Sequence, residues 1–429
     1  MTHTAMPPAT APTPAVAANA PPVPQTTSAK PVRSTPQQLR RLSTALVATG
    51  LVVGLLGALV FTLLTYSLSR AQDDTEQLIR VQRIQTNLLS ADATATNAFL
   101  VGGLEPPAQR ATYDAAISES AALIAEAAQA QPADTAALSA LNQQLTAYAA
   151  TIEQARANNR QGLPVGAQYL RTASAELRSD ALPILDLLVS TNAQRADDGM
   201  DLRLGYLFVT VALLGLVATV FAHIWLSRRF RRRINVGVLA AAALLLASLV
   251  TGLLATQQTG ASVAETKAGS FAAVKTAAQA RIGGNDAKSN ESLTLIARGS
   301  GSAFEQAWAT RADQVRANLD KLPDARDLGE SWSAYTTIHA QIRKLDDGGS
   351  YDAAVAAATG SGKESANSAF NAFDAELADY LQSVSTATAG SLSSRTPGLV
   401  VAAILTLLTG LGAAFAGRAG VEARRQEYR

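Results

Sequence analysis

The protein has 429 residues, of which 48% are hydrophobic, 16% are charged and 5% are aromatic, and its formal net charge is +2. Cysteine is absent, which excludes disulfides, thiolate nucleophiles and cysteine metal ligands, and three histidines leave little for a metal site or an acid–base pair. Four long stretches contain no charged residue, which argues against a soluble globular enzyme.

The chain begins with a tract of proline, alanine and threonine that has almost no acidic or large apolar residues. Such a composition cannot bury a core, and it favours an extended chain. The sequence therefore predicts a disordered tail over residues 1–41.

The four uncharged stretches are long enough to cross a membrane, because a spanning helix needs about 20 predominantly apolar residues. The first is too long for the apolar core of a signal peptide and has no clear cleavage site after it, so it is expected to stay as a signal anchor. The predicted membrane helices cover residues 42–69, 204–227, 234–255 and 396–417.

Arginines give the expected orientation, because cytoplasmic loops retain Lys and Arg near the membrane. The short link 228–233 contains Arg228, Arg229, Arg231, Arg232 and Arg233, and arginines also flank the first and last helices on the same side. We expect a multi-pass protein of the plasma membrane with both termini in the cytoplasm, including the short tail 418–429. The arginines of the link are also candidate contacts for anionic membrane lipid or a cytoplasmic partner.

The segments 70–203 and 256–395 then face the outside. Both are rich in helix formers, show no strand pattern, and are interrupted by Gly- and Pro-rich breaks at the spacing of helical bundles. In the first segment the breaks are GGLEPP, QPADT and NNRQGLPVG, with the outer two expected together at the membrane-distal tip. In the second they are RGSGS, LPDARD and DDGGS, with TGSGK as an expected kink. The predicted fold class is an all-α membrane protein with four membrane helices and two up-down-up-down four-helix bundles.

The two outer segments share residues at matching places. LTAY at 145–148 corresponds to WSAY at 332–335, and Arg156 and Arg343 each follow the tyrosine by eight residues. Tyr113 corresponds to Trp308. These matches predict a tandem repeat of one helix–bundle–helix unit. The aromatic residues are interpreted as bundle core, with ligand lining as the alternative.

No motif for nucleotide binding, acyl transfer, zinc proteolysis or protein phosphorylation occurs in the chain. The sequence therefore predicts no enzyme, no catalytic residue, no metal, no cofactor and no nucleic-acid partner. His223 is the only ionisable residue within the predicted spans, which argues against transport by this chain alone. Small residues predict close helix packing, within the chain or in a homodimer: Gly50, Gly54 and Gly57 in the first helix, and Ala413 and Gly417 in the fourth.

Tall outer bundles joined to membrane helices are suited to passing on a small displacement, which is typical of sensors. Bacterial chemoreceptors and sensor kinases resemble each half, but they carry a linker and an output domain after the second membrane helix. Here only SRRFRRRIN stands at that place, so a separate protein is expected to supply the output.

Four segments carry a further resemblance: ADATATNAFLVGGLEPPAQRATYDAA at 91–116, ANNRQGLPVGAQYLRTAS at 157–174, SLTLIARGSG at 292–301 and YDAAV at 351–355. From about residue 40 to its end, the chain resembles the actinobacterial four-helix membrane sensors of the GlnX type. The resemblance implies that the outer bundles receive an amino-acid-loaded, GlnH-type solute-binding lipoprotein. It also implies a relay through the membrane to a cytoplasmic Ser/Thr kinase of the PknG type, which adjusts glutamate metabolism.

Three hypotheses remain open. The leading one is a transmembrane signalling adaptor, whose candidate docking residues lie in the tip loops: Gly102, Gly103, Glu105, Pro106, Pro107, Asn158, Asn159, Arg160, Gly162 and Pro164. The second is a direct small-molecule receptor, in which Arg156 and Arg343 are candidate contacts for a ligand carboxylate. The third is a structural or accessory subunit of a transport or envelope complex.

Overall fold

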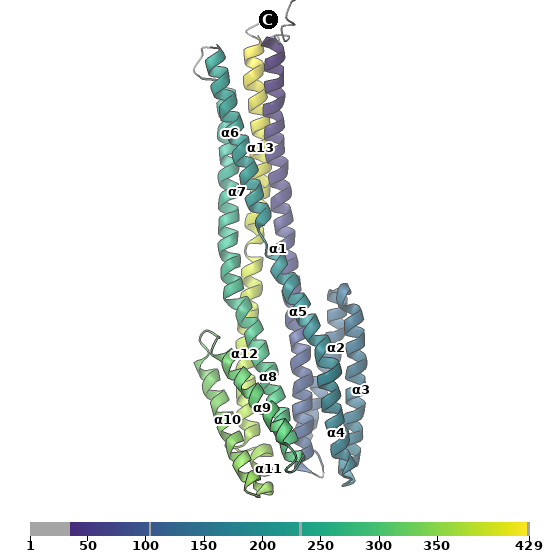
Figure 1. Ribbon diagram of the computed structural model, residues 1–429. Helices are drawn as coiled ribbons and strands as arrows, with labels where there is room; N and C mark the ends of the chain where they lie inside the picture. The colour runs from purple at the N-terminus through teal and green to yellow at the C-terminus, as the bar shows by residue number, and fades with distance from the viewer. Residues whose placement is uncertain (1–34, 103, 231–233, 427–429) are drawn as a thin grey trace, which may run out of the picture.

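A computed structural model describes residues 35–102, 104–230 and 234–426, and within these ranges the chain is helical and contains no strand. The helices form an elongated molecule with two halves (Figure 1). One half, which we call the apolar half, contains four helices packed side by side. The other, the distal half, contains two groups of shorter helices.

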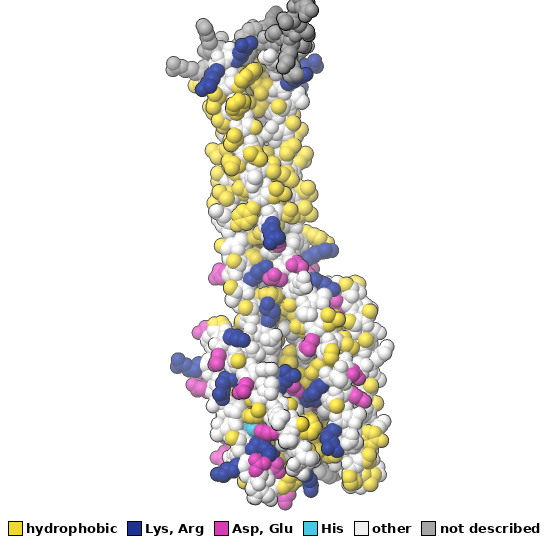
Figure 2. All heavy atoms as spheres, in the orientation of Figure 1, with side chains coloured by type: hydrophobic (Ala, Val, Ile, Leu, Met, Phe, Trp, Pro, Cys, Tyr) yellow, Lys and Arg dark blue, Asp and Glu magenta, His cyan; other side chains and the backbone are white. Residues whose placement is uncertain are grey.

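The apolar half is built from the start of α1 (Thr35–Val101), α6 (Arg203–Phe230), α7 (Val236–Ala268) and α13 (Thr396–Gln426). The predicted four helices of membrane-spanning length are confirmed, and only 28% to 39% of the most apolar window of each is buried inside the protein. The rest faces outward, and Figure 2 shows this half covered by hydrophobic side chains. Helix α1 begins at Thr35, inside the segment expected to be a tail, with Pro36 near its start, where proline's missing N–H is tolerated.

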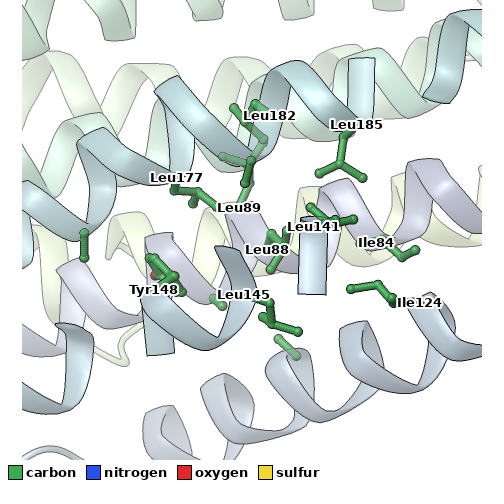
Figure 3. Close-up of a cluster of buried hydrophobic side chains, with 14 of the residues drawn as sticks. Ile84, Leu88, Leu89, Ile124, Leu141, Leu145, Tyr148, Leu177, Leu182 and Leu185 are labelled. Carbon is green, nitrogen blue, oxygen red and sulfur yellow. The ribbon is translucent and has the colours of Figure 1, made fainter. Parts of the chain in front are cut away.

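The first distal region, residues 70–199, comprises the second part of α1 with α2 (Pro107–Ala130), η1 (Pro132–Asp134), α3 (Thr135–Arg160), α4 (Val165–Glu176), η2 (Leu177–Ala181) and α5 (Leu182–Gly199). Apolar residues at three-to-four spacing give α1 a buried stripe that includes Ile84 and Leu88. Figure 3 shows this stripe facing Leu141 and Leu145 of α3. Each such side chain contributes about 1.5–3 kcal/mol by leaving water, so the stripe fixes how α1 is placed among its neighbours.

The second distal region, residues 270–393, comprises α8 (Ser270–Ile296), α9 (Ser302–Leu319), α10 (Arg326–Asp347), α11 (Tyr351–Thr359) and α12 (Ala366–Ser393). The segment TGSGK, expected to kink one helix, instead separates two. The side chain of Ser365 accepts a hydrogen bond from the backbone N–H of Ser368 at 3.3 Å and starts α12 as a new helix. This region therefore has five helices where four were expected, and the tandem repeat of bundles remains a prediction.

Three of the four connections between the halves are interrupted. The helical chain breaks at residues 200–202 between α5 and α6, at Gly269 between α7 and α8, and near Ser394 between α12 and α13. Ser67 of α1 donates a hydrogen bond to the carbonyl of Gly199 at 2.8 Å, so the first break lies beside the middle of α1. Lys267 forms an ion pair with Asp197, and the hydroxyl oxygens of Thr266 and Ser391 are 2.6 Å apart. These contacts place all three breaks at a common level along the molecule. Only α1 passes this level unbroken.

Glycines bring the helices of the apolar half close together. A Cβ atom on Gly50 would lie 2.5 Å from the backbone nitrogen of Ala414, and Gly54 and Gly410 face each other backbone to backbone. A Cβ on Gly57 would lie 2.7 Å from Thr406. The first-helix glycines therefore pack within the chain against α13.

The two small residues predicted in α13 lie near this crossing but do not form its centre. Ala413 is buried, and a Cβ on Gly417 would lie 3.1 Å from Cβ of Leu46. The closest approach of α13 to α1 is at Gly410 instead, which was not among the predicted packing residues.

Candidate functional site

The two outer loops of the first distal region lie together at its tip. Arg156, near the end of α3, places its guanidinium 2.9 Å from the carboxylate of Glu105, in the loop between α1 and α2. The same guanidinium stacks over the ring of Tyr113, 4.0 Å from its centroid, and only 11% of the side chain is exposed. This ion pair and the cation–π contact fasten the first tip loop and the start of α2 to the end of α3.

A cavity of about 260 Å³ opens beside this ion pair. Its lining combines mostly buried apolar side chains with polar and charged ones that are at least partly exposed. The apolar lining residues include Ala95, Ala98, Phe99, Ile152, Ala155 and Leu170, and the polar ones are Glu105, Arg110, Arg156, Asn159 and Arg160. A cavity with an apolar wall and a few converging polar groups is the usual form of a small-molecule site.

The predicted docking residues divide into those that shape the loops and those that reach the cavity. Gly102 and Gly162 have φ values of 70° and 69°, a left-handed conformation that glycine adopts without strain. The prolines mark helix starts, since Pro107 is the first residue of α2 and Pro106 and Pro164 precede α2 and α4. Asn158 bonds the carbonyl of Gln154 within α3, and Gly103 lies outside the described residues.

Arg343, the second predicted carboxylate contact, is already surrounded by carboxylates. Its guanidinium nitrogens lie 3.4 Å from Glu305, 2.7 Å from Asp346 and 2.6 Å from Asp347. Arg156 and Arg343 thus lie in different distal regions, and the structure does not bring them together.

Beside Arg343, the second distal region contains a buried cluster of charged and aromatic groups around His339. The imidazole of His339 stacks on the ring of Trp308 at a centroid distance of 3.5 Å, and it bonds Glu291 at 2.9 Å and Glu305 at 3.2 Å. Burial would lower the pKa of His339, but the hydrogen bonds to the two glutamates outweigh it and raise that pKa. Burial would likewise raise the pKa of Glu291, yet Lys288 and His339 hold it at about 2.

The boundary between the two distal regions contains a hydrogen-bonded and charged network that was not predicted from the sequence. Asp92 of α1 is fully buried and accepts hydrogen bonds from Tyr148 at 3.2 Å and from Ser174 at 2.6 Å, both in its own region. It also accepts one from Ser289 of α8 at 2.6 Å, across the boundary. Its fourth partner is Arg178, at 3.1 Å.

Arg178 joins the regions a second time, because its guanidinium also lies 2.7 Å from Asp286 of α8. Burial would lower the pKa of Arg178, but Asp92 and Asp286 outweigh it and raise that pKa, so the side chain stays charged. Arg178 belongs to η2, a π-helical turn, and such turns occur frequently at functional sites. Asp92 stands in a stretch of small, otherwise uncharged residues, and this was the available signal for a buried charge, whereas Asp286 has Arg281, Lys288 and Glu291 close to it in the sequence.

The arginines predicted to contact lipid or a cytoplasmic partner lie at the far end of the apolar half. Arg228 and Arg229 are exposed in the last turn of α6, and Arg231, Arg232 and Arg233 lie outside the described residues. Figure 2 shows basic side chains at this end, beyond the apolar surface. On the face shown, acidic side chains appear only in the distal half.

A family model described as an actinobacterial sensor domain matches residues 67–201. The match covers the first distal region, including the cavity and both Asp92 and Arg178, and it supports a sensor protein of the actinobacterial kind. No curated protein matches the chain. No solved structure matches it either.

Proposed function

We propose that this sensor protein is a transmembrane signalling adaptor of the GlnX type, which receives an amino-acid signal at its distal half and passes it to a separate protein in the cytoplasm. The observation that carries the proposal is the continuity of α1. This helix of 67 residues runs from the arginine-rich end to the tip, and its residues Ala95 and Phe99 line the cavity.

A continuous helix transmits a displacement between its ends. Shifts of about 1–2 Å of one helix against another are sufficient in known switches. An event at the tip moves α1 relative to the helices beside it, and α13 contacts α1 through Gly50 and Gly54 in the apolar half. The signal then reaches the end that carries Arg228 and Arg229.

The identity of the partners rests on the resemblance described above. In the proposed complex, a solute-binding lipoprotein of the GlnH type docks on the tip loops in its amino-acid-loaded form. A Ser/Thr kinase of the PknG type contacts the arginine-rich end and controls glutamate metabolism. The exposed side chain of Leu104, in the first tip loop, supports docking there, because 84% of it is open to solvent.

The first experiment is affinity purification of the tagged full-length protein from gently crosslinked membranes, with and without external amino acid. We expect a solute-binding lipoprotein and a kinase to co-purify, in amounts that depend on the amino acid. The variant Leu104→Ser should lose the lipoprotein and keep the kinase. The matched control is Leu187→Ser on α5, where an exposed leucine (63%) lies away from the tip loops. Recovery of transporter or envelope subunits without a kinase contradicts the adaptor and favours the accessory role.

A second variant tests the other end. Replacing Arg228 and Arg229 by alanine should reduce kinase recovery while the lipoprotein still binds. Because arginines also fix membrane orientation, an inverted protein would mimic this loss. The chain has no cysteine, so single cysteines introduced at the tip and in the tail report orientation without background.

A further inference from the structure

The two distal regions differ at the positions that line the tip cavity. Counted from Tyr148 and Tyr335, the residue seven places on is Ala155 in the first region and Ile342 in the second. Ala155 lines the cavity, whereas Ile342 is fully buried in the core of its region. The smaller side chain contributes to the open volume in the first region.

The residue four places on differs in the same direction. It is Ile152 in the first region, where it lines the cavity, and His339 in the second. His339 fills its surroundings by stacking on Trp308 and bonding Glu305. In the second region, aromatic and charged side chains therefore fill the space that corresponds to the open cavity of the first region.

Charge differs as well. The eleventh and twelfth residues after the tyrosine are Asn159 and Arg160 in the first region but Asp346 and Asp347 in the second. Both aspartates bond Arg343. The first region lacks these carboxylates, and Arg160 has no hydrogen bond or ion pair with any residue that the structure describes.

The other arginines of the cavity are partly neutralised. Arg156 pairs with Glu105 and with Glu153 at 2.8 Å, and Arg110 pairs with Asp114 and Glu153. Of these three acids, only Glu105 lines the cavity. The mouth therefore presents three guanidinium groups and one carboxylate beside an apolar wall.

We propose that the tip cavity of the first distal region binds a free α-amino acid directly. Its carboxylate pairs with Arg160 and the neighbouring guanidinium groups, as the carboxylates of Asp346 and Asp347 pair with Arg343 in the second region. Its ammonium group faces Glu105, and its side chain lies against the apolar wall near Ala155. The site shares the sensing role proposed above but needs no lipoprotein.

The size of the cavity agrees with a ligand of this class. Ligand pockets generally measure about 300–1,000 Å³, so 260 Å³ selects a small molecule. A purely anionic ligand would leave Glu105 without a new partner, and a purely apolar one would desolvate the guanidinium of Arg160, which has no described ion pair. An amino acid satisfies the acidic, basic and apolar groups together.

The test is binding of each of the twenty common amino acids, one at a time, to the purified full-length protein in lipid nanodiscs, by thermal shift and calorimetry. We expect at least one to raise the unfolding temperature, since a ligand that binds only the folded state stabilises it. The amide of that amino acid, which lacks the carboxylate, should bind at least about tenfold more weakly, because one charge-assisted interaction is lost.

Two variants place the site. Arg160→Asp introduces the residue of the second region and should weaken binding by about tenfold or more, since it repels the ligand carboxylate. Its matched control is Arg316→Asp on α9, another exposed arginine without a described ion pair, which should bind as the unaltered protein does. Ala155→Ile fills the cavity and should abolish binding. Because Arg160 is exposed, its variant is expected to fold even if the Ala155 variant does not.

The proposal is overturned if none of the twenty amino acids binds at millimolar concentration, or if Arg160→Asp binds with unchanged affinity. The outcomes separate this site from the adaptor role. Co-purification of lipoprotein and kinase without amino-acid binding to the pure protein removes only the cavity proposal. Amino-acid binding without a co-purifying kinase removes only the adaptor.

Discussion

In the apolar half, α1 and α13 meet backbone to backbone at Gly54 and Gly410, whereas in the distal half α1 and α8 meet through the carboxylate of Asp92 and the hydroxyl of Ser289. The first contact depends on the absence of side chains and involves no charge. The second depends on buried charge and hydrogen bonds. At these two contacts, shape holds α1 where lipid would surround it, and buried polar groups hold it to α8 in the distal half.

Because of this difference, we expect the apolar half to be sensitive to side-chain volume and the distal half to be sensitive to charge. A glycine contact responds to volume and is indifferent to pH and salt. A buried ion pair responds to any change in the charge of its members, because an unpaired charge in the interior is costly. We therefore expect the distal half to be the part that a chemical signal can rearrange.

The largest effect is expected for Arg178→Ala at the boundary between the distal regions. Asp286 keeps Arg311 at 2.7 Å, but Asp92, which is fully buried, loses the one cationic partner it has among the described residues. Breaking such a pair costs about 3–5 kcal/mol. The measurement is the free energy of unfolding of the full-length protein by denaturant in detergent.

The double variant Arg178→Ala, Asp92→Asn provides the control for that experiment. Removing the stranded charge should recover part of the lost stability. A loss below about 1 kcal/mol for Arg178→Ala alone would mean that water reaches the boundary, as at exposed ion pairs.

The next effect concerns pH and the second distal region. The pKa of His339 is raised above its ordinary value of 6.5, so its stabilising contribution is complete below 6.5 and is lost as pH rises through the folded-state pKa. Glu291 acts in the opposite sense: its pKa falls from 4.5 to about 2, so its contribution is present above 4.5 and is lost as pH falls toward 2. This cluster is most stabilising between about 4.5 and 6.5.

His339→Gln should flatten the alkaline side of that profile and cost about 1.5–3 kcal/mol at pH 6, the range for hydrogen bonds to charged groups. The measurement is the unfolding midpoint as a function of pH. An unchanged alkaline slope in His339→Gln would show that another group produces it.

A smaller effect is expected where the apolar half is tightest. Gly410→Leu forces a side chain into the backbone of Gly54, and overpacking of this kind costs about 1–3 kcal/mol. Gly398→Leu is the matched control on the same helix, since a Cβ there meets nothing within 4 Å. Thermal unfolding at several pH values should show the loss for Gly410→Leu alone, and equally at each pH.

The smallest effect is expected for an exposed ion pair. Arg83 and Glu119 join α1 to α2, but their side chains are 58% and 39% exposed. Glu119→Ala should therefore cost at most about 1 kcal/mol. The cost should disappear in about 1 M salt, where the screening length falls to about 3 Å. A larger or salt-independent loss would remove the distinction between buried and exposed charge on which the comparison rests.

The membrane helices could be predicted because an uncharged run of sufficient length decides the matter locally. The boundary network could not, since Asp92 and Arg178 are separated by 86 positions and helical periodicity does not say which face of one group of helices meets another. The same limit applies to Gly410: small residues at helical spacing predict a close contact, but they do not give its register.

The tip was partly predictable. The spacing from Tyr148 to Arg156 identified a cation near the loops, and the structure places it beside Glu105. The cavity itself depends on Ala155 being small, and an alanine in an alanine-rich helix gives no signal by itself. The tandem repeat, the orientation in the membrane and the partners remain predictions.

Of the four connections between the halves, α1 is continuous and stiff, and the other three can bend at the breaks near Gly199, Gly269 and Ser394. Bending at a joint absorbs a tilt of the helices beyond it, whereas an unbroken helix of 67 residues carries that tilt onward. A tilt of the distal half is therefore carried into the apolar half by α1 and reaches α6, α7 and α13 to a smaller extent. The direction and size of any movement passed through the membrane are set by the single helix α1.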